Sequence, residues 1–546
     1  MAASFKEDEV NMPVMRESGS DGTDPDDEAQ STGTDLVEDA TAQAGSTLEA
    51  KLQMTAVAHL IARQELTRPE VLRTTPARRV LSCFCRVLRD GAYSSDLYKY
   101  SASSTEIPQF WSHSWHGRTS NKIMLLLTVF NGFPASVLGS LAVLFCLLWS
   151  RGRGKGHALA MAVGLVVSVL ACLFWRPQRR VFLDKICIHQ TDSVLKAEGV
   201  FNVAAMLKHS TSMMVCWDTT YIHRLWCVLE IAAFLKSHGS SAKLHIKPLL
   251  WGFTAVFSFV GLTTFFGLLL VFEVDRPTQQ PPDEDQSLLS IVLPLAVVPI
   301  AALCLAWVAA TLRAHFRDTE TVLAQLRGFS FERDPVCHCC SVNHTSPTTG
   351  TPMPCDRELL AACVALWFGS VADFDTYVQQ DVAAAFEENL GQFGVPYSWI
   401  VGSTVPVLWW APMYSWNYTL NPDGSFLRGT VRDNMLGAAT IMYWVAVWWL
   451  LCIPMIFLFW QKILRKGRRR RSRVWQEVLI NLACGISVGL IYTIVQLLDV
   501  SGLLAWQYLL GEDFYLEAWL ASSSCLMVIL LCLLHGQGLK LLCRPN

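Results

Sequence analysis

Residues 249–272 read LLWGFTAVFSFVGLTTFFGLLLVF and contain no charged side chain until the run ends. A helix needs about 20 apolar residues to cross a membrane. Four further segments meet this length: 288–311, 436–460, 476–498 and 515–535. Over all 546 residues, 52% are hydrophobic and 16% are charged, against about 25% charged in an average soluble domain. This composition excludes a simple soluble globule and a wholly disordered chain, and it predicts an α-helical polytopic membrane protein.

Three apolar segments are less regular. Residues 396–416 contain three prolines and several tryptophans, which predicts a kinked span. Residues 133–149 and 157–175 form a shorter hairpin whose turn, 151-RGRGKGH-157, is strongly basic. A basic turn on the outer side would violate the positive-inside tendency. Whether 133–175 spans the bilayer is therefore left open.

Loop charges predict the orientation of the spans. The segment 461–473 holds eight Lys and Arg and is predicted to be cytoplasmic, whereas the acidic loop 273–287 is predicted to lie outside. A glycosylation sequon at Asn417 then falls on the outer side, which favours the plasma membrane or an endomembrane. The predicted organisation begins with a disordered acidic tail without signal-peptide character (1–46), a helical amphipathic region (47–104) and an α/β region (105–248). Two spans follow (249–311), and then a cytoplasmic Cys-rich loop with amphipathic helices (312–395). The chain ends with four spans (396–535) and a cytoplasmic tail (536–546).

Basic residues near the membrane suggest the lipid surface as a partner. Arg78, Arg79, Arg86 and Arg89 flank apolar residues, as in a short amphipathic helix on an anionic membrane face. The run Arg468–Arg471 lies between two spans without interleaved aromatic residues. Anchoring at an anionic leaflet explains this run better than nucleic-acid binding. Membrane lipid is the expected partner, and no nucleic acid is expected.

Residues 107–248 alternate between strand and helix patterns. Strand-like segments are 109-QFWSHSWHG-117, the start of 180-RVFLDKICIHQTD-192, the centre of 210-STSMMVCWDTTY-221 and 243-KLHIKPL-249. Helical spacing is found in residues 194–209 and 222–237. This alternation predicts a small doubly wound α/β domain with a parallel sheet.

Several of these segments resemble the Toll/interleukin-receptor (TIR) family. They are FWSHSW (110–115), VFLDK (181–185), the strand 212–215 and the pattern Tyr221-x-x-Arg224-x-Trp226-Cys227-x-x-Glu230. The resemblance covers about 90 of the 546 residues in two pieces, interrupted by the apolar hairpin. Arg224 stands where the family usually has Ser, and the family's last strand and helix are missing. The resemblance implies a flavodoxin-like, TIR-like domain over 105–248.

The resemblance implies two functions. Some TIR domains assemble with each other in signalling, and others cleave NAD at the nicotinamide–ribose bond. In the second case Glu230 is the implied catalytic residue, and Lys185, Arg224 and Trp226 are implied to contact NAD. The residues themselves also fit packing roles for Trp226 and Glu230. A signalling or scaffold protein with TIR self-association is the first hypothesis, and a membrane-tethered NAD glycohydrolase is the second.

A transporter or channel is a third hypothesis. Transporters usually place ionisable groups within their spans. The regular spans of this chain carry almost none, and Asp499 is expected at the end of one. Transport is therefore the least favoured of the three functions.

A cysteine-rich segment suggests a metal site. Zinc is bound by thiolates and imidazoles, usually in tetrahedral sets. The candidate ligands are Cys337, Cys339, Cys340, His344 and Cys355. Their spacing matches no standard zinc finger, and free or acylated cysteines are the alternative. The residues that follow, 356–392, are predicted to form two amphipathic helices with Val378, Val382 and Phe386 on the inner face.

Overall fold

The structure is a computed structural model that describes residues 52, 54–89, 95–114, 117–150, 155–274, 284–345, 350, 355–390, 395–410, 431–511 and 514–534. The chain divides into two units, Met1–Thr55 and Ala56–Asn546. All features below belong to the second unit. The predicted acidic tail 1–46, the sequon at Asn417 and the tail 536–546 lie outside the described residues.

Five helical segments are long and apolar enough to cross a membrane. They are Thr119–Trp149, His157–Phe174, Leu250–Leu270, Met435–Lys466 and Val474–Leu510. They lie on α3 (Thr119–Ser150), α4 (Lys155–Phe174), α9 (Leu250–Val274), the continuous α17–η5–α18 (Val431–Met442, Tyr443–Cys452, Ile453–Lys466) and α19 (Val474–Leu510). The predicted span 288–311 lies on α10 (Glu284–Arg327), and 515–535 gives a shorter apolar helix within α20 (Tyr515–Leu534). The prediction of a helical, multi-pass membrane protein is confirmed at this level.

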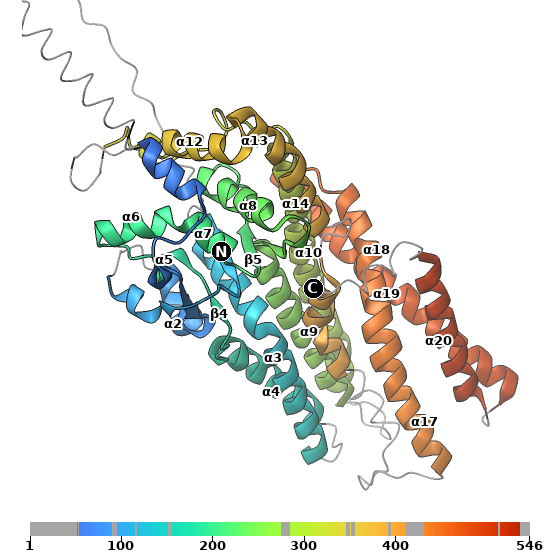
Figure 1. The fold of residues 1–546 in the computed structure, drawn as a ribbon. Coiled ribbons are helices and arrows are strands. Elements are labelled where there is room, and N and C mark those ends of the chain that lie inside the picture. The colour runs from blue at the N-terminus through green and yellow to red at the C-terminus, as the bar shows by residue number, and fades with distance from the viewer. Residues whose placement is uncertain are drawn as a thin grey trace, which may run out of the picture. The chain divides into compact units, whose positions relative to one another are not determined.

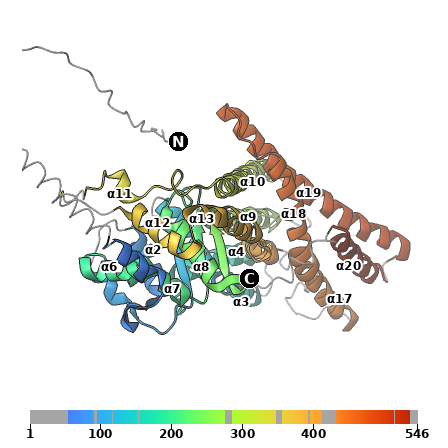
Figure 2. The ribbon, with the colours of Figure 1, turned by 45° about the horizontal axis from the view of Figure 1, so that its top comes forward.

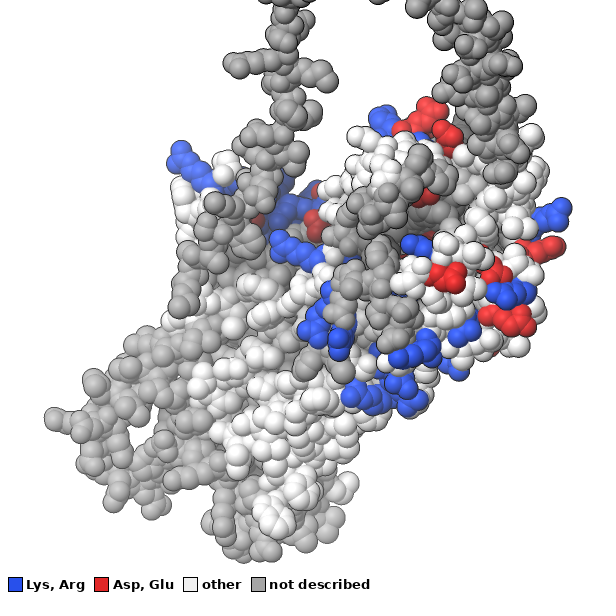
Figure 3. All heavy atoms as spheres, turned by 90° about the vertical axis from the view of Figure 1, so that its left-hand side faces the viewer, with Lys and Arg blue, Asp and Glu red and all other residues white. Residues whose placement is uncertain are grey.

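The hairpin of α3 and α4 has the length and the surface of a membrane-spanning pair. Helix α3 begins at Thr119, well before the predicted start, and continues through Pro134. Phe145 and Trp149 on α3 are 64% and 80% exposed, and Leu159 on α4 is 63% exposed. Figure 3 shows coloured Lys, Arg, Asp and Glu side chains gathered at one end of this face, with a white, uncharged surface beyond them. Because such a large exposed apolar surface belongs in lipid rather than water, the structure favours the spanning alternative.

The long helices pack side by side. Helix α3 contacts α4 and α9, α9 contacts α10, and α10 contacts α19, which in turn contacts α20 (Figures 1 and 2). Two glycines allow close approach: a side chain at Gly252 on α9 would collide with the backbone of α3, and one at Gly485 on α19 would collide with the backbone of α10. Small residues at such contacts are typical of helices packed in membranes.

The α/β region contains a parallel sheet whose last strand directly precedes a membrane-spanning helix. It has the order β3 (Phe110–His113), β5 (Met213–Trp217) and β6 (Leu244–Pro248), with Ser112 opposite Val215 and Val215 opposite Ile246. Three of the four predicted strands therefore share one parallel sheet.

The remaining predicted strand is much shorter than 180–185. Strand β4 (Arg180–Val181) pairs antiparallel with β1 (Arg73–Pro76), which also pairs with β2 (Ala102–Ser103). Phe182 continues the chain from β4 and forms a parallel bridge with Phe110 of β3. The strand ends there because Asp184 begins the helical turn α5 (Asp184–Cys187), where its carboxylate accepts a hydrogen bond from the Lys185 N–H at 2.7 Å.

The predicted helices of this region are present in the structure. One of them is divided into two helices, and another is buried in the protein rather than lying on a membrane surface. Residues 194–209 become α6 (Ser193–Phe201) and α7 (Val203–Lys208), and 222–237 becomes α8 (Leu225–His238). The basic helix is α2 (Ala77–Arg89), but its apolar face, including Val80, Leu81 and Cys85, is buried in the protein core. The expectation that this face lies on the membrane is therefore wrong, because the protein itself covers it. Short 3₁₀ turns complete the region: η1 (Pro69–Val71), η2 (Ser95–Tyr100) and η3 (Gly239–Ser241).

The segment after α10 forms a helical layer. It contains α11 (His338–Ser341), α12 (Asp356–Phe368), α13 (Val371–Tyr377), the π-helical turn η4 (Val378–Val382) and α14 (Ala383–Leu390). The chain bends by 75° between α12 and α13. Val378, Val382 and Phe386 are fully buried, which confirms the predicted inner face. Helix α15 (Tyr397–Ser403) follows at the start of the predicted kinked span.

Asp499 lies inside the long helix α19, so the expectation that it ends a span is wrong. Its side chain is 6% exposed. One carboxylate oxygen accepts hydrogen bonds from Tyr443 at 2.7 Å and Trp519 at 3.1 Å, and the other accepts one from Trp448 at 3.1 Å. The sequence places these three donors far from Asp499, and only the folded bundle brings them together.

Asp499→Leu should destabilise the bundle by about 3 kcal/mol, because Tyr443 and Trp448 lose their acceptor, whereas Trp519 keeps the Asp499 backbone carbonyl. Asp499→Asn keeps one acceptor oxygen and should cost about half as much. Thermal unfolding of the protein in detergent measures both, with Val500→Leu at the neighbouring exposed position as a control. If Asp499→Leu were as stable as the wild type, the hydrogen bonds to Asp499 would not stabilise the bundle.

Candidate functional site

Polar side chains converge where β3 and β5 end. Thr220 donates a hydrogen bond to the Asp218 carboxylate at 2.5 Å, and Ser114 and Thr220 hydroxyls lie 3.0 Å apart. Gly117, in the loop after β3, leaves the space that Asp218 and Lys122 occupy, since a side chain there would collide with the Asp218 carboxylate. The ends of adjacent parallel strands, where the chain order reverses, are the usual ligand position in open α/β sheets.

Glu230 lies beside the middle of β3. Helix α8 packs on this strand and directs the Glu230 carboxylate at Ser112, whose hydroxyl donates a 2.5 Å hydrogen bond to Oε2. Because the Ser112 proton is used in this bond, the Tyr221 hydroxyl, 2.5 Å away, donates to Ser112. Ser112 and Tyr221 are fully buried, whereas Glu230 keeps a small exposed fraction. The three residues form a chain of hydrogen bonds that ends at the Glu230 carboxylate.

The surroundings of Glu230 disfavour its charged form. Burial raises the pKa of Glu230 to about 8, the Ser112 hydrogen bond opposes this rise, and the negative charge of Asp184 adds to it. Burial also raises the pKa of Tyr221 and Cys227 well above their usual ranges, so both stay protonated. A carboxyl group with a raised pKa near a strand edge is typical of functional sites, although structural networks shift pKa values too.

A second pair of groups lies near the same edge. His113, at the end of β3, has its Nε2 atom 4.0 Å from an oxygen of Asp184. Burial lowers the pKa of His113, and the Asp184 charge partly offsets that effect. The neighbouring Lys185 reaches toward α2, where its Nζ atom donates to the Val87 carbonyl at 3.4 Å. Lys185, implied to contact NAD, is therefore held close to this edge by α2.

Arg224 and Trp226 make contacts with the segment that follows α10. The backbone at Arg224 forms a parallel bridge with Val336, and the Val336 N–H donates to the His223 carbonyl at 2.7 Å. The Trp226 indole N–H donates to Asp356 at 3.4 Å. The Arg224 backbone and the Trp226 indole thus contact the cysteine-rich segment, and the charge of Arg224 lowers the pKa of the buried Cys227 thiol against the effect of burial. Sequence reasoning missed this because the partners lie more than 100 positions away.

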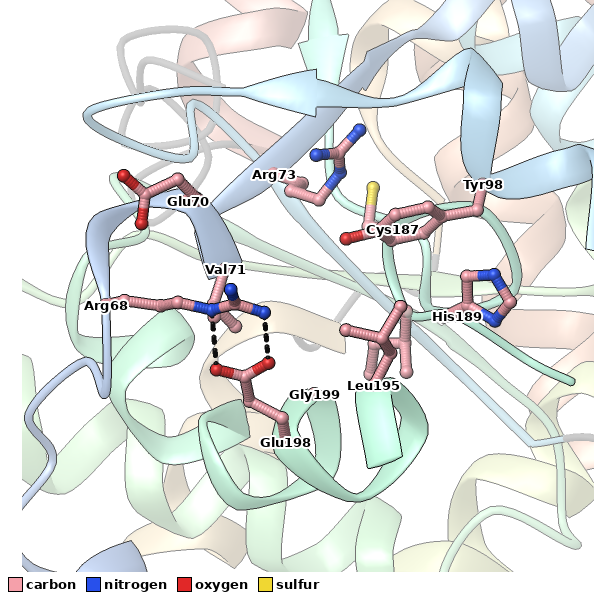
Figure 4. A pocket seen from close by; sticks show the side chains of 11 residues that line it. Arg68, Glu70, Val71, Arg73, Tyr98, Cys187, His189, Leu195, Glu198 and Gly199 are labelled. Carbon is pink, nitrogen blue, oxygen red and sulfur yellow. Dashed lines mark hydrogen bonds and ion pairs between the residues drawn. The ribbon is translucent and has the colours of Figure 1, made fainter. Parts of the chain in front are cut away.

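A pocket of about 200 Å³ is lined by residues of η1, β1, η2, α5 and α6 (Figure 4). Arg68 closes one wall with a 2.6 Å ion pair to Glu198, and the Arg73 guanidinium lies 4.2 Å from the centre of the Tyr98 ring. None of the residues predicted to bind NAD lines this pocket. Its cations already have protein partners.

The structure brings four of the five predicted metal ligands together. The ligand atoms of Cys339, Cys340, His344 and Cys355 all lie within 4.8 Å of one another. Cys337 is not part of this group, and its side chain is buried in the main apolar core.

Sequence reasoning identified Glu230 but missed its partners Ser112 and Tyr221. A signal was present for Ser112, which is a small polar residue at the centre of the otherwise bulky strand FWSH. Tyr221 was quoted in the helix motif without a role.

Comparison of the chain with family models, with curated proteins and with solved structures finds no match in any of the three.

Proposed function

We propose that this chain is a membrane-anchored hydrolase of the TIR-like type, which cleaves NAD at the nicotinamide–ribose bond with Glu230 as its catalytic residue. The observation that carries the proposal is the Glu230 carboxyl group, whose pKa is raised by burial and which Ser112 holds one residue before the carboxyl end of β3. The strand order gives further support. Phe182 forms a single parallel bridge beside β3, so the order Phe182, β3, β5, β6 follows the second, first, third, fourth order of flavodoxin-like folds with the second strand reduced to one bridge.

The proposed reaction uses water as the nucleophile. The bond between C1′ of the ribose and the nicotinamide nitrogen breaks, and its electron pair stays with nicotinamide. Water adds to C1′, so the products are nicotinamide, ADP-ribose and one proton. Positive charge develops at C1′ in the transition state, and a positioned carboxylate stabilises it. Only ionised Glu230 can do this.

The direct test is nicotinamide release by the full-length protein in nanodiscs, beside Glu230→Gln. Glu65→Gln, which changes an exposed carboxylate elsewhere, is the matched control. Release by the wild type and Glu65→Gln but not by Glu230→Gln supports the proposal. Equal release by all three proteins, or none by a folded wild type, overturns it.

The pH dependence of cleavage should report on Glu230. Because the active form is the carboxylate and the pKa of Glu230 is about 8, the rate should rise up to about pH 8. Ser112→Ala removes a hydrogen bond to the charged form, which contributes about 1.5 kcal/mol. The rising limb should then move to higher pH by about 1 unit. Ser241→Ala, at an exposed position outside the site, is the control, and an unshifted limb in Ser112→Ala would argue against Glu230 as the titrating group.

A second candidate function is a signalling or scaffold module that associates with other TIR-like domains. It is favoured by the internal contacts of Arg224 and Trp226, which give these motif residues a structural role. Concentration-dependent self-association of the full-length protein in nanodiscs, measured by mass photometry together with the absence of NAD cleavage, would support this function. A monomer at all concentrations would count against it.

A further inference from the structure

We propose that Cys339, Cys340, His344 and Cys355 form a closed, structural zinc site that fixes the cysteine-rich segment against the start of helix α8. Cys339 and Cys340 lie on α11, His344 lies in the turn after it, and Cys355 immediately precedes α12. Three thiolates and one imidazole are a common ligand set of structural zinc. This site is separate from Glu230 and does not depend on the proposed hydrolase function.

The three distances from the Cys340 sulfur to the other ligand atoms are close to those of a tetrahedron around zinc. Bonds of about 2.3 Å to sulfur and about 2.05 Å to nitrogen, at tetrahedral angles, place two sulfurs about 3.8 Å apart and a sulfur and nitrogen about 3.6 Å apart. The Cys340 sulfur lies 3.9 Å from that of Cys339, 3.9 Å from that of Cys355 and 3.6 Å from Nε2 of His344. All six separations are within 4.8 Å. One cation at the centre reaches all four atoms with little movement.

The backbone is shaped to bring these ligands together. Asn343 and His344 adopt left-handed conformations, with φ of 51° and 54°. Left-handed backbone is unfavourable for residues other than glycine and persists where surrounding contacts hold it. Here the His344 N–H donates to the Cys339 carbonyl at 2.7 Å, which turns the imidazole back toward Cys340.

Residues next to the four candidate zinc ligands help to hold them in position. The Asp356 N–H donates to the Cys339 sulfur at 3.3 Å, and hydrogen bonds of this kind orient metal ligands. The Arg357 guanidinium donates to the carbonyls of Phe331, Glu332 and Pro335, which fixes the chain that leads into the site. The ligand group is thus held from both sides.

The position of the site indicates what it stabilises. Val336, just before the ligands, pairs with the backbone at His223 and Arg224, and Asp356, just after Cys355, accepts the Trp226 hydrogen bond. Zinc would close the chain between Cys340 and Cys355 and hold both contacts in place. All four positions are filled by protein ligands, as in structural rather than catalytic zinc sites. The exposed His344 provides an entry path.

The experiment measures zinc in the full-length protein, purified in detergent from cells supplied with zinc. We expect one zinc per chain by mass spectrometry, and loss of at least nine-tenths of it in His344→Ala. This variant changes an exposed residue, so failure to fold is not expected. His344→Cys, which restores a fourth ligand, should recover the zinc. Cys525→Ser is the control for removing an exposed cysteine outside the group.

Cobalt(II) provides a second measurement on the same proteins. The wild type should show thiolate-to-cobalt charge transfer and tetrahedral d–d bands, both lost in His344→Ala or changed in His344→Cys. Three results would overturn the proposal: a wild type without zinc after supplementation, equal zinc in the wild type and His344→Ala, or a disulfide among Cys339, Cys340 and Cys355 in freshly purified protein.

Discussion

Glu230→Gln should make the protein more stable at neutral and alkaline pH, whatever its effect on the proposed NAD cleavage. Burial raises the pKa of Glu230 from 4.5 to about 8, so the folded protein binds this proton more tightly than the unfolded chain does. The stabilisation is complete below pH 4.5 and is lost as the pH rises toward 8, because the unfolded chain then gains from ionising. Gln stays neutral, keeps an acceptor for Ser112 and avoids this loss.

We expect the gain in stability to reach about 4 kcal/mol near pH 8 and to be small near pH 4.5. Thermal unfolding of the wild type and Glu230→Gln across this pH range measures the difference. Glu65→Gln, at an exposed position, should follow the wild type throughout. If Glu230→Gln were less stable than the wild type at pH 8, or if the difference did not depend on pH, burial would not keep the Glu230 carboxyl group neutral.

Arg313→Met should destabilise the protein by about 3–5 kcal/mol. The Arg313 side chain is fully buried near the end of α10 and donates to both oxygens of Glu477 on α19, at 2.9 and 3.3 Å. It also donates to Asn481 and to the carbonyls of Gly467 and Arg469. Methionine preserves much of the volume but removes the donor of several carbonyls and leaves Glu477 with only the Arg471 N–H at 3.1 Å and Arg317 at 3.8 Å. The planar guanidinium fork makes Arg313→Lys an incomplete replacement, with an intermediate loss.

Thermal unfolding in detergent measures this loss, and two comparisons make it specific. Arg327→Met breaks an exposed ion pair with Glu387, and its effect should stay within about 0.5 kcal/mol. The double variant Arg313→Met with Glu477→Met should be more stable than the sum of the single losses predicts, because it removes the unpaired charge. A small effect of Arg313→Met would show that the α10–α19 contact does not depend on this ion pair.

The apolar runs and the alternation of strands and helices were readable in the sequence. Runs such as 249–272 predict spans because their composition alone decides whether a helix is stable in lipid. The strands around Ser112, Val215 and Ile246 were placed in one sheet because their local patterns and the family resemblance agreed. The extent of α3 was underestimated because Gly132 and Pro134 indicate a break in soluble helices, whereas the helix continues through them.

The candidate site was only partly predictable, since its geometry depends on contacts between distant segments. Glu230 was found through the helix motif, but its hydrogen bond to Ser112 joins residues 118 positions apart. The environment of Trp226 depends on Asp356, 130 positions away, which no local pattern encodes. The metal ligands were easier to identify because four of them lie within a short segment, although only the fold separates Cys337 from the others.

Strand β6 passes into the membrane helix α9 with a single residue between Pro248 and Leu250. That residue, Leu249, still pairs with β5 through a 3.0 Å hydrogen bond to the Trp217 carbonyl, and Trp251 in the first turn of α9 is buried in the core. The junction between β6 and α9 therefore contains no flexible residue that could act as a hinge. Strand β6 and helix α9 are therefore rigidly connected. We expect a change in bilayer thickness that tilts α9 to move the sheet as well, including its carboxyl edge beside Asp218.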